Sequence, residues 1–151
     1  MDGVSFVTAS GGWRDDPGRT FVIREDGSLW GWGCNSDNAI GIGLGCVVTE
    51  PVHIKDGVAF VDAASFSSVT FAIMKDGSLW GWGNCVEGQR GTRRHIMDGV
   101  VSFAAGGTGN SPASPLVMKQ DGSVWTGVWS FDHTWPPSGD LLPPVQVIFP
   151  D

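Results

Sequence analysis

Apolar and polar residues alternate in short runs along most of the chain, and glycine, aspartate and proline interrupt these runs. Alternation with a period of two predicts half-buried β-strands. No longer stretch holds the 3.6-residue apolar period of an amphipathic helix, because Gly or Pro interrupts every candidate. The pattern therefore predicts an all-β fold.

The clearest predicted element is a β-hairpin at residues 20–33, TFVIREDGSLWGWG. An Asp-Gly pair between two apolar runs is a strong hairpin signal, because Gly tolerates a positive φ. In the second half of the hairpin, Trp30 and Trp32 share one face, while Leu29 and Gly31 share the other. We expect this strand to be buried on both faces, with glycine allowing a neighbouring sheet to approach.

The hairpin occurs three times, and related segments surround each copy. The three copies are at 20–33, 70–83 and 115–129, and their turn aspartates are Asp26, Asp76 and Asp121. An Asp-Gly-Val segment precedes each copy, at 2–10, 56–65 and 98–107. A further short segment follows each copy, at 50–54, 93–96 and 143–148. We therefore predict one repeat domain, residues 1–151, whose units lie at about 1–54, 55–96 and 97–151.

Four short strands in each unit are typical of one blade of a β-propeller. The expected fold is propeller-type, with three antiparallel four-stranded blades. The repeats resemble the regulator-of-chromosome-condensation repeat family, whose units carry a DG turn followed by an aromatic residue and a W-G pair. DGSLWGWG occurs at 26–33 and at 76–83, whereas the third copy has Trp-Thr-Gly-Val-Trp at 125–129.

The resemblance implies a ring of about seven blades. It also implies protein partners, including guanine-nucleotide-exchange targets and, in bacterial relatives, inhibited enzymes. Neither activity is carried over to this chain, because the residues that match are scaffold residues.

Three blades cannot close a ring, so the first and last blades would expose apolar faces and strand edges. We expect self-association, and a six-bladed homodimer is the simplest closed form. The chain begins at an Asp-Gly-Val segment and ends with the segment that closes a unit, which favours three whole units. A fragment of a longer protein is the alternative.

Charge and composition exclude several classes of partner. The net charge is −7, whereas nucleic-acid binding needs a clustered surplus of Lys and Arg. We expect the short basic run of Arg90, Arg93 and Arg94 to be a solvated loop. The sequence shows no signal peptide and no apolar stretch that could span a membrane, so cytoplasmic residence is the default expectation.

The sequence predicts no metal site and no cofactor. The three cysteines form no CxxC pair, so we expect ordinary reduced thiols rather than a thiol site of Cys34, Cys85 and His95. A single Asp-Gly per turn supplies too few ligands for calcium. The glycine-rich segments at 41–45 and 106–111 open no helix, unlike phosphate-binding loops.

The candidate residues fall into two groups. We predict that the structural core of the repeats contains Trp30, Trp32, Trp80, Trp82, Trp125, Gly27, Gly77 and Gly122. The candidate binding surface consists of Trp13, Arg14, Asp15, Asp16, Phe66, Thr108 and Asn110. These binding candidates follow the first strand of each unit, so we place them on one rim, with Trp13 as a contact anchor. We place the loops after each W-G strand on the opposite rim, at 34–49, 84–94 and 130–142.

Enzyme classes fit the sequence poorly. Sialidase chemistry needs a tyrosine nucleophile, and the chain has no Tyr. There is no G-x-S-x-G elbow, and we interpret His53, His95 and His133 as lying at different points of their repeats. The sequence therefore favours a noncatalytic protein-binding or assembly scaffold. The alternative is a propeller-type lyase or hydrolase with a His base in the assembled channel, which converging histidines would favour.

Overall fold

The computed structural model describes residues 3–11, 18–43, 45–64, 68–83, 93–105, 115–126 and 144–150. Within these residues the chain forms strands and one short 3₁₀ helix, η1 (Ser36–Asn38). The first sheet contains β1 (Val4–Ser10), β2 (Arg19–Arg24), β3 (Leu29–Cys34) and β4 (Val47–Lys55). The second sheet contains β5 (Val58–Ala63), β6 (Val69–Met74), β7 (Leu79–Gly83) and β8 (Arg94–Met97). The third sheet contains β9 (Val100–Ala104), β10 (Leu116–Lys119), β11 (Val124–Thr126) and β12 (Val145–Gln146).

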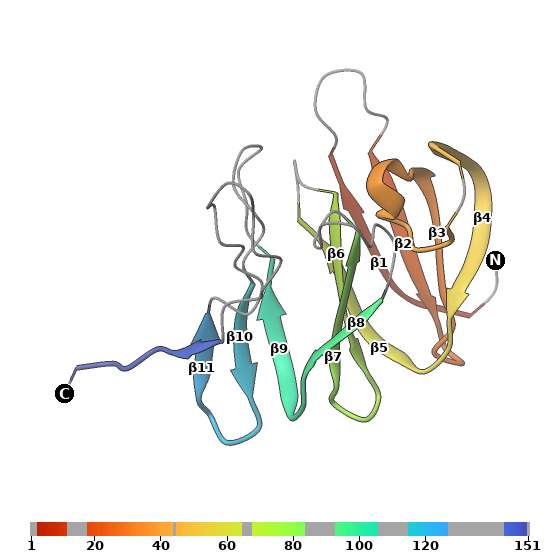
Figure 1. Ribbon diagram of the computed structural model, residues 1–151. Coiled ribbons are helices and arrows are strands. Elements are labelled where there is room, and N and C mark those ends of the chain that lie inside the picture. The colour runs from red at the N-terminus through yellow and green to blue at the C-terminus, as the bar shows by residue number, and fades with distance from the viewer. Residues whose placement is uncertain are drawn as a thin grey trace, which may run out of the picture.

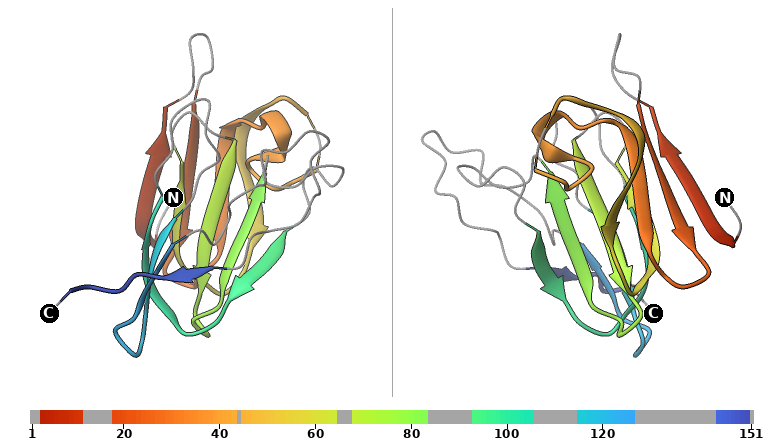
Figure 2. Two further views of the ribbon diagram at one scale, coloured as in Figure 1. Left: turned by 60° about the vertical axis from the view of Figure 1, so that its left-hand side comes forward. Right: turned by 90° about the vertical axis from the view of Figure 1, so that its right-hand side faces the viewer.

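Each sheet has four strands in sequence order, and every neighbouring pair is antiparallel. The predicted fold of three antiparallel four-stranded blades is therefore confirmed. We call the sheets blades 1, 2 and 3, and Figures 1 and 2 show them side by side in that order. The third blade has the shortest last pairing, because only Trp125↔Gln146 and Thr126↔Val145 join β11 to β12.

The Asp-Gly-Ser turn has the same internal bonding in all three blades. In blade 1 the Asp26 carboxylate accepts bonds from the Ser28 amide (2.8 Å) and hydroxyl (2.6 Å). The Ser28 hydroxyl oxygen in turn accepts a bond from the Trp30 indole, at 3.0 Å. Asp76 and Asp121 head equivalent networks in the other blades. The turn glycines have φ between +82° and +85°, a conformation that favours glycine over other residues.

Gly31 shows why tryptophan and glycine alternate in β3. A Cβ on Gly31 would lie 2.9 Å from Ile54 Cδ1 and 3.0 Å from Phe21 Cδ1. Both side chains belong to the same blade as Gly31, on β4 and β2. The glycine thus makes room for side chains of its own sheet, and our expectation that it admits a neighbouring sheet was wrong here.

The blades pack face to face through two apolar clusters. One cluster joins blades 1 and 2 and includes Phe21, Leu29, Val61 and Trp82, each with an exposed fraction of 0%. The other joins blades 2 and 3 and includes Phe71 and Val117. The first strands of the blades lie close together, because Phe60 of β5 contacts Phe6 of β1 (ring centroids 5.1 Å apart) and Phe103 of β9 (5.2 Å).

The two sets of long connections leave the blades at the same end. Arg19 of β2 pairs with both Ser10 of β1 and Gly33 of β3, and the Cys34 amide donates to the Gly18 carbonyl, at 2.7 Å. The β1–β2 and β3–β4 connections therefore share one end, which we call the loop rim (Figure 1). We call the other end, with the Asp-Gly-Ser turns, the DG rim. The prediction of opposite rims was wrong, because four antiparallel strands return the third connection to the end of the first.

Candidate functional site

The predicted binding residues lie in loops outside the described residues. This holds for Trp13, Arg14, Asp15, Asp16, Phe66, Thr108 and Asn110. The strand ends that flank these loops are described, and they pair as Ser10↔Arg19, Ala63↔Thr70 and Ala104↔Leu116. All three pairs are at the loop rim, so the three loops leave from the same side of the molecule.

Residues 35–43 form the best described part of the loop rim. The Asn35 side chain accepts a bond from the Ile40 amide (2.8 Å) and donates to the Gly45 carbonyl (3.1 Å). Asn38 accepts from the Gly43 amide, at 2.6 Å. Asp37 and Asn38 have φ of 54° and 59°, which Asn and Asp tolerate better than most residues. Side-chain bonds therefore fix the path of this loop.

The same segment covers blade 2. The Ala39 carbonyl accepts bonds from the Thr70 hydroxyl (2.7 Å) and from the Trp82 indole (3.0 Å). Both donors have an exposed fraction of 0%. The loop after the first W-G strand therefore also joins two blades.

Arg93 crosses the same joint from the other side. Its guanidinium donates to the carbonyls of Gly41 (3.0 Å) and Ile54 (2.8 Å), both in blade 1. It also lies over the Trp82 ring, 5.9 Å from the centroid. Burial lowers the pKa of Arg93, although an arginine stays protonated at neutral pH. The expectation of a solvated basic loop was wrong for Arg93, because its positive charge is used to bind backbone carbonyls of the neighbouring blade.

The tryptophans of the repeats differ in burial. Trp82 is fully buried between blades 1 and 2, whereas the others are half-buried: Trp30, Trp32, Trp80 and Trp125. Of the turn glycines, Gly27 and Gly77 are buried, and Gly122 is exposed. Trp82 of the inner blade is thus buried, whereas Trp32, at the same position of blade 1, is partly exposed.

Two histidines occupy equivalent positions, contrary to our interpretation of the sequence. His53 pairs with Trp30 across β4 and β3, and His95 pairs with Trp80 across β8 and β7. Each Nε2 lies 2.8 Å from the carboxylate three residues later, in Asp56 and Asp98. The shared segments are HIKDGV at 53–58 and HIMDGV at 95–100, so the sequence did contain the signal.

These histidines are far from a channel-facing position. They lie on the fourth strands β4 and β8, whereas the first strands β1 and β5 approach each other. The carboxylate on an inner strand is Asp62 of β5, which accepts bonds from Thr8 Oγ1 (3.4 Å) and the Ala63 amide (2.9 Å). Burial raises the pKa of the Asp62 carboxyl, but no histidine contacts it among the described residues. His133 lies outside the described residues.

The cysteines and acidic residues form no reactive cluster in the parts of the chain that the structure describes. Cys34 is a buried free thiol with Sγ 3.1 Å from the Ser36 hydroxyl, and Cys46 is an exposed free thiol. Cys85 lies outside the described residues. No group of three His, Cys, Asp or Glu side chains there could hold a metal ion, and no helix there is long and apolar enough to cross a membrane.

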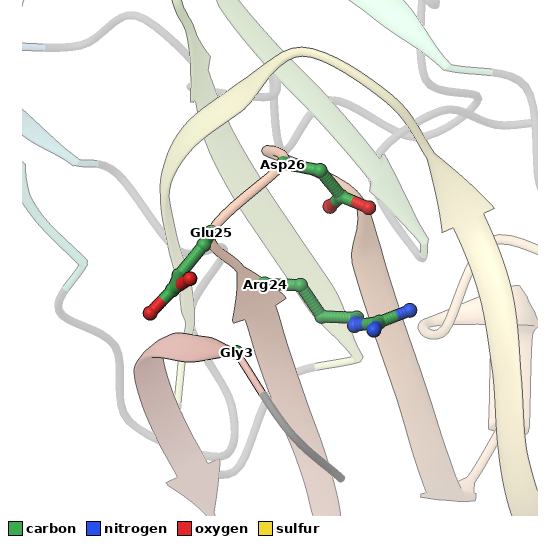
Figure 3. A pocket seen from close by; sticks show the side chains of 4 residues that line it. All are labelled: Gly3, Arg24, Glu25 and Asp26. Carbon is green, nitrogen blue, oxygen red and sulfur yellow. The ribbon is translucent and has the colours of Figure 1, made fainter.

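A depression lies at the DG rim of blade 1. It has a volume of about 360 Å³ and is lined by Gly3, Arg24, Glu25 and Asp26. Figure 3 shows the three charged side chains around it, with the Glu25 and Arg24 side chains pointing to opposite sides. Hydrogen bonds from the Ser28 hydroxyl and amide lower the pKa of Asp26, so this carboxylate is charged at neutral pH. The depression is open, and the described residues that line it form no convergent catalytic group.

Comparisons with known proteins agree with this architecture. The family model of the regulator of chromosome condensation (RCC1) repeat matches residues 26–73. These residues run from the turn of blade 1 into β6 of blade 2 and so cross the boundary between the two blades. No curated protein sequence matches the chain.

Two solved structures share the fold. Prp20p from Saccharomyces cerevisiae, studied with its binding to Gsp1p and histones, has a TM-score of 0.61 and 18% identity, and the match covers 83% of this chain and 31% of that chain. A chain in the structure of Kap60 bound to yeast RCC1 (Prp20) has a TM-score of 0.58 and 22% identity, with 79% and 28% covered. The present chain thus spans less than a third of each neighbour. The predicted family resemblance is confirmed: residues 26–73 carry a regulator of chromosome condensation (RCC1) repeat, and the three sheets have the propeller-blade fold.

Proposed function

We propose that this chain is a noncatalytic protein-binding scaffold whose loop rim is the recognition surface. The observation that carries the proposal is the difference between the two rims. The DG rim repeats one internally bonded turn three times. At the loop rim, both connections of each blade leave together, and these connections differ from blade to blade in length and sequence.

Such an arrangement suits recognition, because binding residues are often on variable loops that a rigid scaffold positions. The neighbours agree with a protein partner, since Prp20p is described with Gsp1p and histones, and Prp20 with Kap60. We do not assign these partners to this chain, because the chain spans under a third of each of those proteins. The described histidines lend no support to the alternative of a His base in an assembled channel, since His53 and His95 lie on outer strands.

A site-specific photocrosslinker tests which rim contacts a partner. Trp13 in the β1–β2 connection and Phe149 after β12 are replaced one at a time by a photoreactive phenylalanine analogue. Both changes replace an aromatic residue, and Phe149 is 70% exposed at the position equivalent to Asp56 of the DG rim. Each variant is irradiated in a lysate of the cells that produce the protein.

We expect the Trp13 variant to capture a specific protein that excess unlabelled wild-type chain displaces, and the Phe149 variant to capture none. Equal capture by both variants, or capture by neither, would refute the loop rim as the recognition surface. Circular dichroism of both variants verifies that the β-sheet content equals that of the wild type.

A further inference from the structure

Each blade has a front face toward the preceding blade and a back face toward the following one. Two side chains of the second strand and one of the third strand are buried on the back face of the two blades that have a following blade. In blade 1 these are Phe21, Ile23 and Leu29, with exposed fractions of 0%, 3% and 0%, and in blade 2 they are Phe71, Ile73 and Leu79, with 0%, 5% and 0%. Both internal joints therefore use the same positions.

The back face of blade 3 has no following blade in this chain. Its equivalents of Phe21 and Ile23 are Leu116 and Met118, which are 48% and 44% exposed. On the outer strand side, Val145 and Ile148 are 60% and 77% exposed. Ile148 is equivalent to Lys55, whose Nζ lies 5.7 Å from the Trp80 ring centroid of the next blade. Leu116 and Met118 thus expose apolar side chains at positions that both internal joints bury.

The front face of blade 1 is uncovered in the same way. Val61 and Trp82 on the front face of blade 2 are both 0% exposed. The equivalent residues of blade 1 are Val7, which is 62% exposed, and Trp32, which is half-buried. Val7 and Trp32 therefore lie, on blade 1, at the positions that blade 2 uses to contact blade 1.

A backbone bond at the DG rim completes each internal joint. The Val58 amide donates to the Gly27 carbonyl of the preceding turn (2.9 Å), and the Val100 amide donates to the Gly77 carbonyl (2.9 Å). The equivalent groups at the two ends are the Val4 amide and the Gly122 carbonyl. Neither makes the corresponding bond among the described residues.

The depression in Figure 3 lies where this bond would form. Gly3 and Glu25, which line the depression, are equivalent to Gly57 and Lys75 of blade 2. In the first joint, the Asp-Gly-Ser turn of blade 1 packs against this part of blade 2. There the Lys75 ammonium donates to the Asp26 carbonyl, at 3.1 Å. Glu25 cannot donate such a bond, so a joint at this place would be held by the backbone pair and by apolar contacts.

We propose that a second copy of this chain covers both open faces. The back face of blade 3 in each copy docks on the front face of blade 1 in the other, with Gly122 in the depression beside Glu25. Two identical joints then close a two-fold ring of six blades, within the usual range of about four to eight. A second copy fits because the open faces are the two halves of the joint that the chain already forms twice within itself.

Charge substitutions on the two faces test this pairing. Val7 and Met118 are equivalent to Val61 and Ile23, which share one apolar cluster. Val7→Lys and Met118→Asp each place an unpaired charge in both joints of a homodimer, so we expect the dissociation constant to rise at least about tenfold for each. Phe149→Asp is the control, because it restores the aspartate of the other blades at an exposed position outside both faces.

Native mass spectrometry reads the outcome. We expect the wild type and Phe149→Asp to be dimers. Each charged variant alone should be a monomer of 16.0 kDa with the same β-sheet content as the wild type. An equimolar mixture of the two charged variants should form heterodimers. The heterodimer has one unchanged joint and one Lys–Asp pair. A folded wild-type monomer, charged variants that dimerise like the wild type, or a mixture of folded variants that stays monomeric would overturn the proposal. Recovery in the mixture also distinguishes lost pairing from lost folding.

Discussion

Asp26, Asp76 and Asp121 show how one residue position shapes the whole repeat. Each carboxylate accepts two bonds from the serine two residues later, and that serine receives the indole N–H of the next tryptophan. The serine hydroxyl is the first cause, and the serine amide the second, of the lowered pKa of all three carboxyls. The turns are thus fixed by bonds that are stronger to the ionised carboxylate than to the neutral acid.

The pH dependence of stability follows from these shifts. Because the pKa of each carboxyl is lower in the folded protein than its ordinary value of 3.8, the stabilisation is complete above about pH 4 and is lost as the pH falls through the folded-state pKa. We predict that the free energy of unfolding, measured by urea titration, declines below pH 4. The triple variant Asp26→Asn, Asp76→Asn, Asp121→Asn should show a much weaker decline.

Glu50→Gln is the control for this series, because the Glu50 side chain is exposed and none of the side-chain bonds found among the described residues involves it. Its acid profile should follow that of the wild type. An unchanged decline in the triple variant would show that other groups cause the acid sensitivity.

At the scale of elements, the joint between blades 1 and 2 depends on contacts that are distant in sequence. Thr70, Trp82 and Arg93 all donate to backbone carbonyls of blade 1. The joint removes these donors and carbonyls from water. Their mutual hydrogen bonds replace the lost bonds to water, and without them the buried polar groups would destabilise the joint.

Arg93→Met should destabilise the protein by about 2 kcal/mol, because it removes charged donors from the carbonyls of Gly41 and Ile54. Arg94→Met is a matched control, since Arg94 makes no such bond to blade 1 among the described residues; its effect should stay within about 0.5 kcal/mol. Chemical denaturation of both variants measures the difference. Equal effects would mean that Arg93 contributes only as a surface charge.

Local patterns predicted the hairpins, because an Asp-Gly turn and the alternation in TFVI and LWGW act over few residues. The role of Arg93 could not be predicted, since its acceptors are 39 and 52 residues away. The shared rim and the equivalence of His53 and His95 were within reach of the sequence: counting strand directions gives the first, and the HIxDGV segments give the second. The binding candidates such as Trp13 stay predictions, because a loop sequence does not specify the surface that it presents.

At the scale of the molecule, the chain is a row of three blades held together by two apolar joints of the same kind. The two faces that meet in such a joint also occur, uncovered, at the two ends of the row. Leu116 and Met118 at one end, and Val7 at the other, expose apolar surface that the equivalent residues bury. Burying such surface is favourable at roughly 25 cal/mol per Å², which gives a driving force for covering both faces. A covered ring would leave the loop rim free for a partner.

The molar mass of the wild-type chain, measured by light scattering over a dilution series, tests this account most directly. We predict a species of twice the 16.0 kDa chain mass that persists on dilution and does not grow at higher concentration, because a closed ring has no open face left. A folded monomer at every concentration would contradict the account, since it would show that both apolar faces are stable in water.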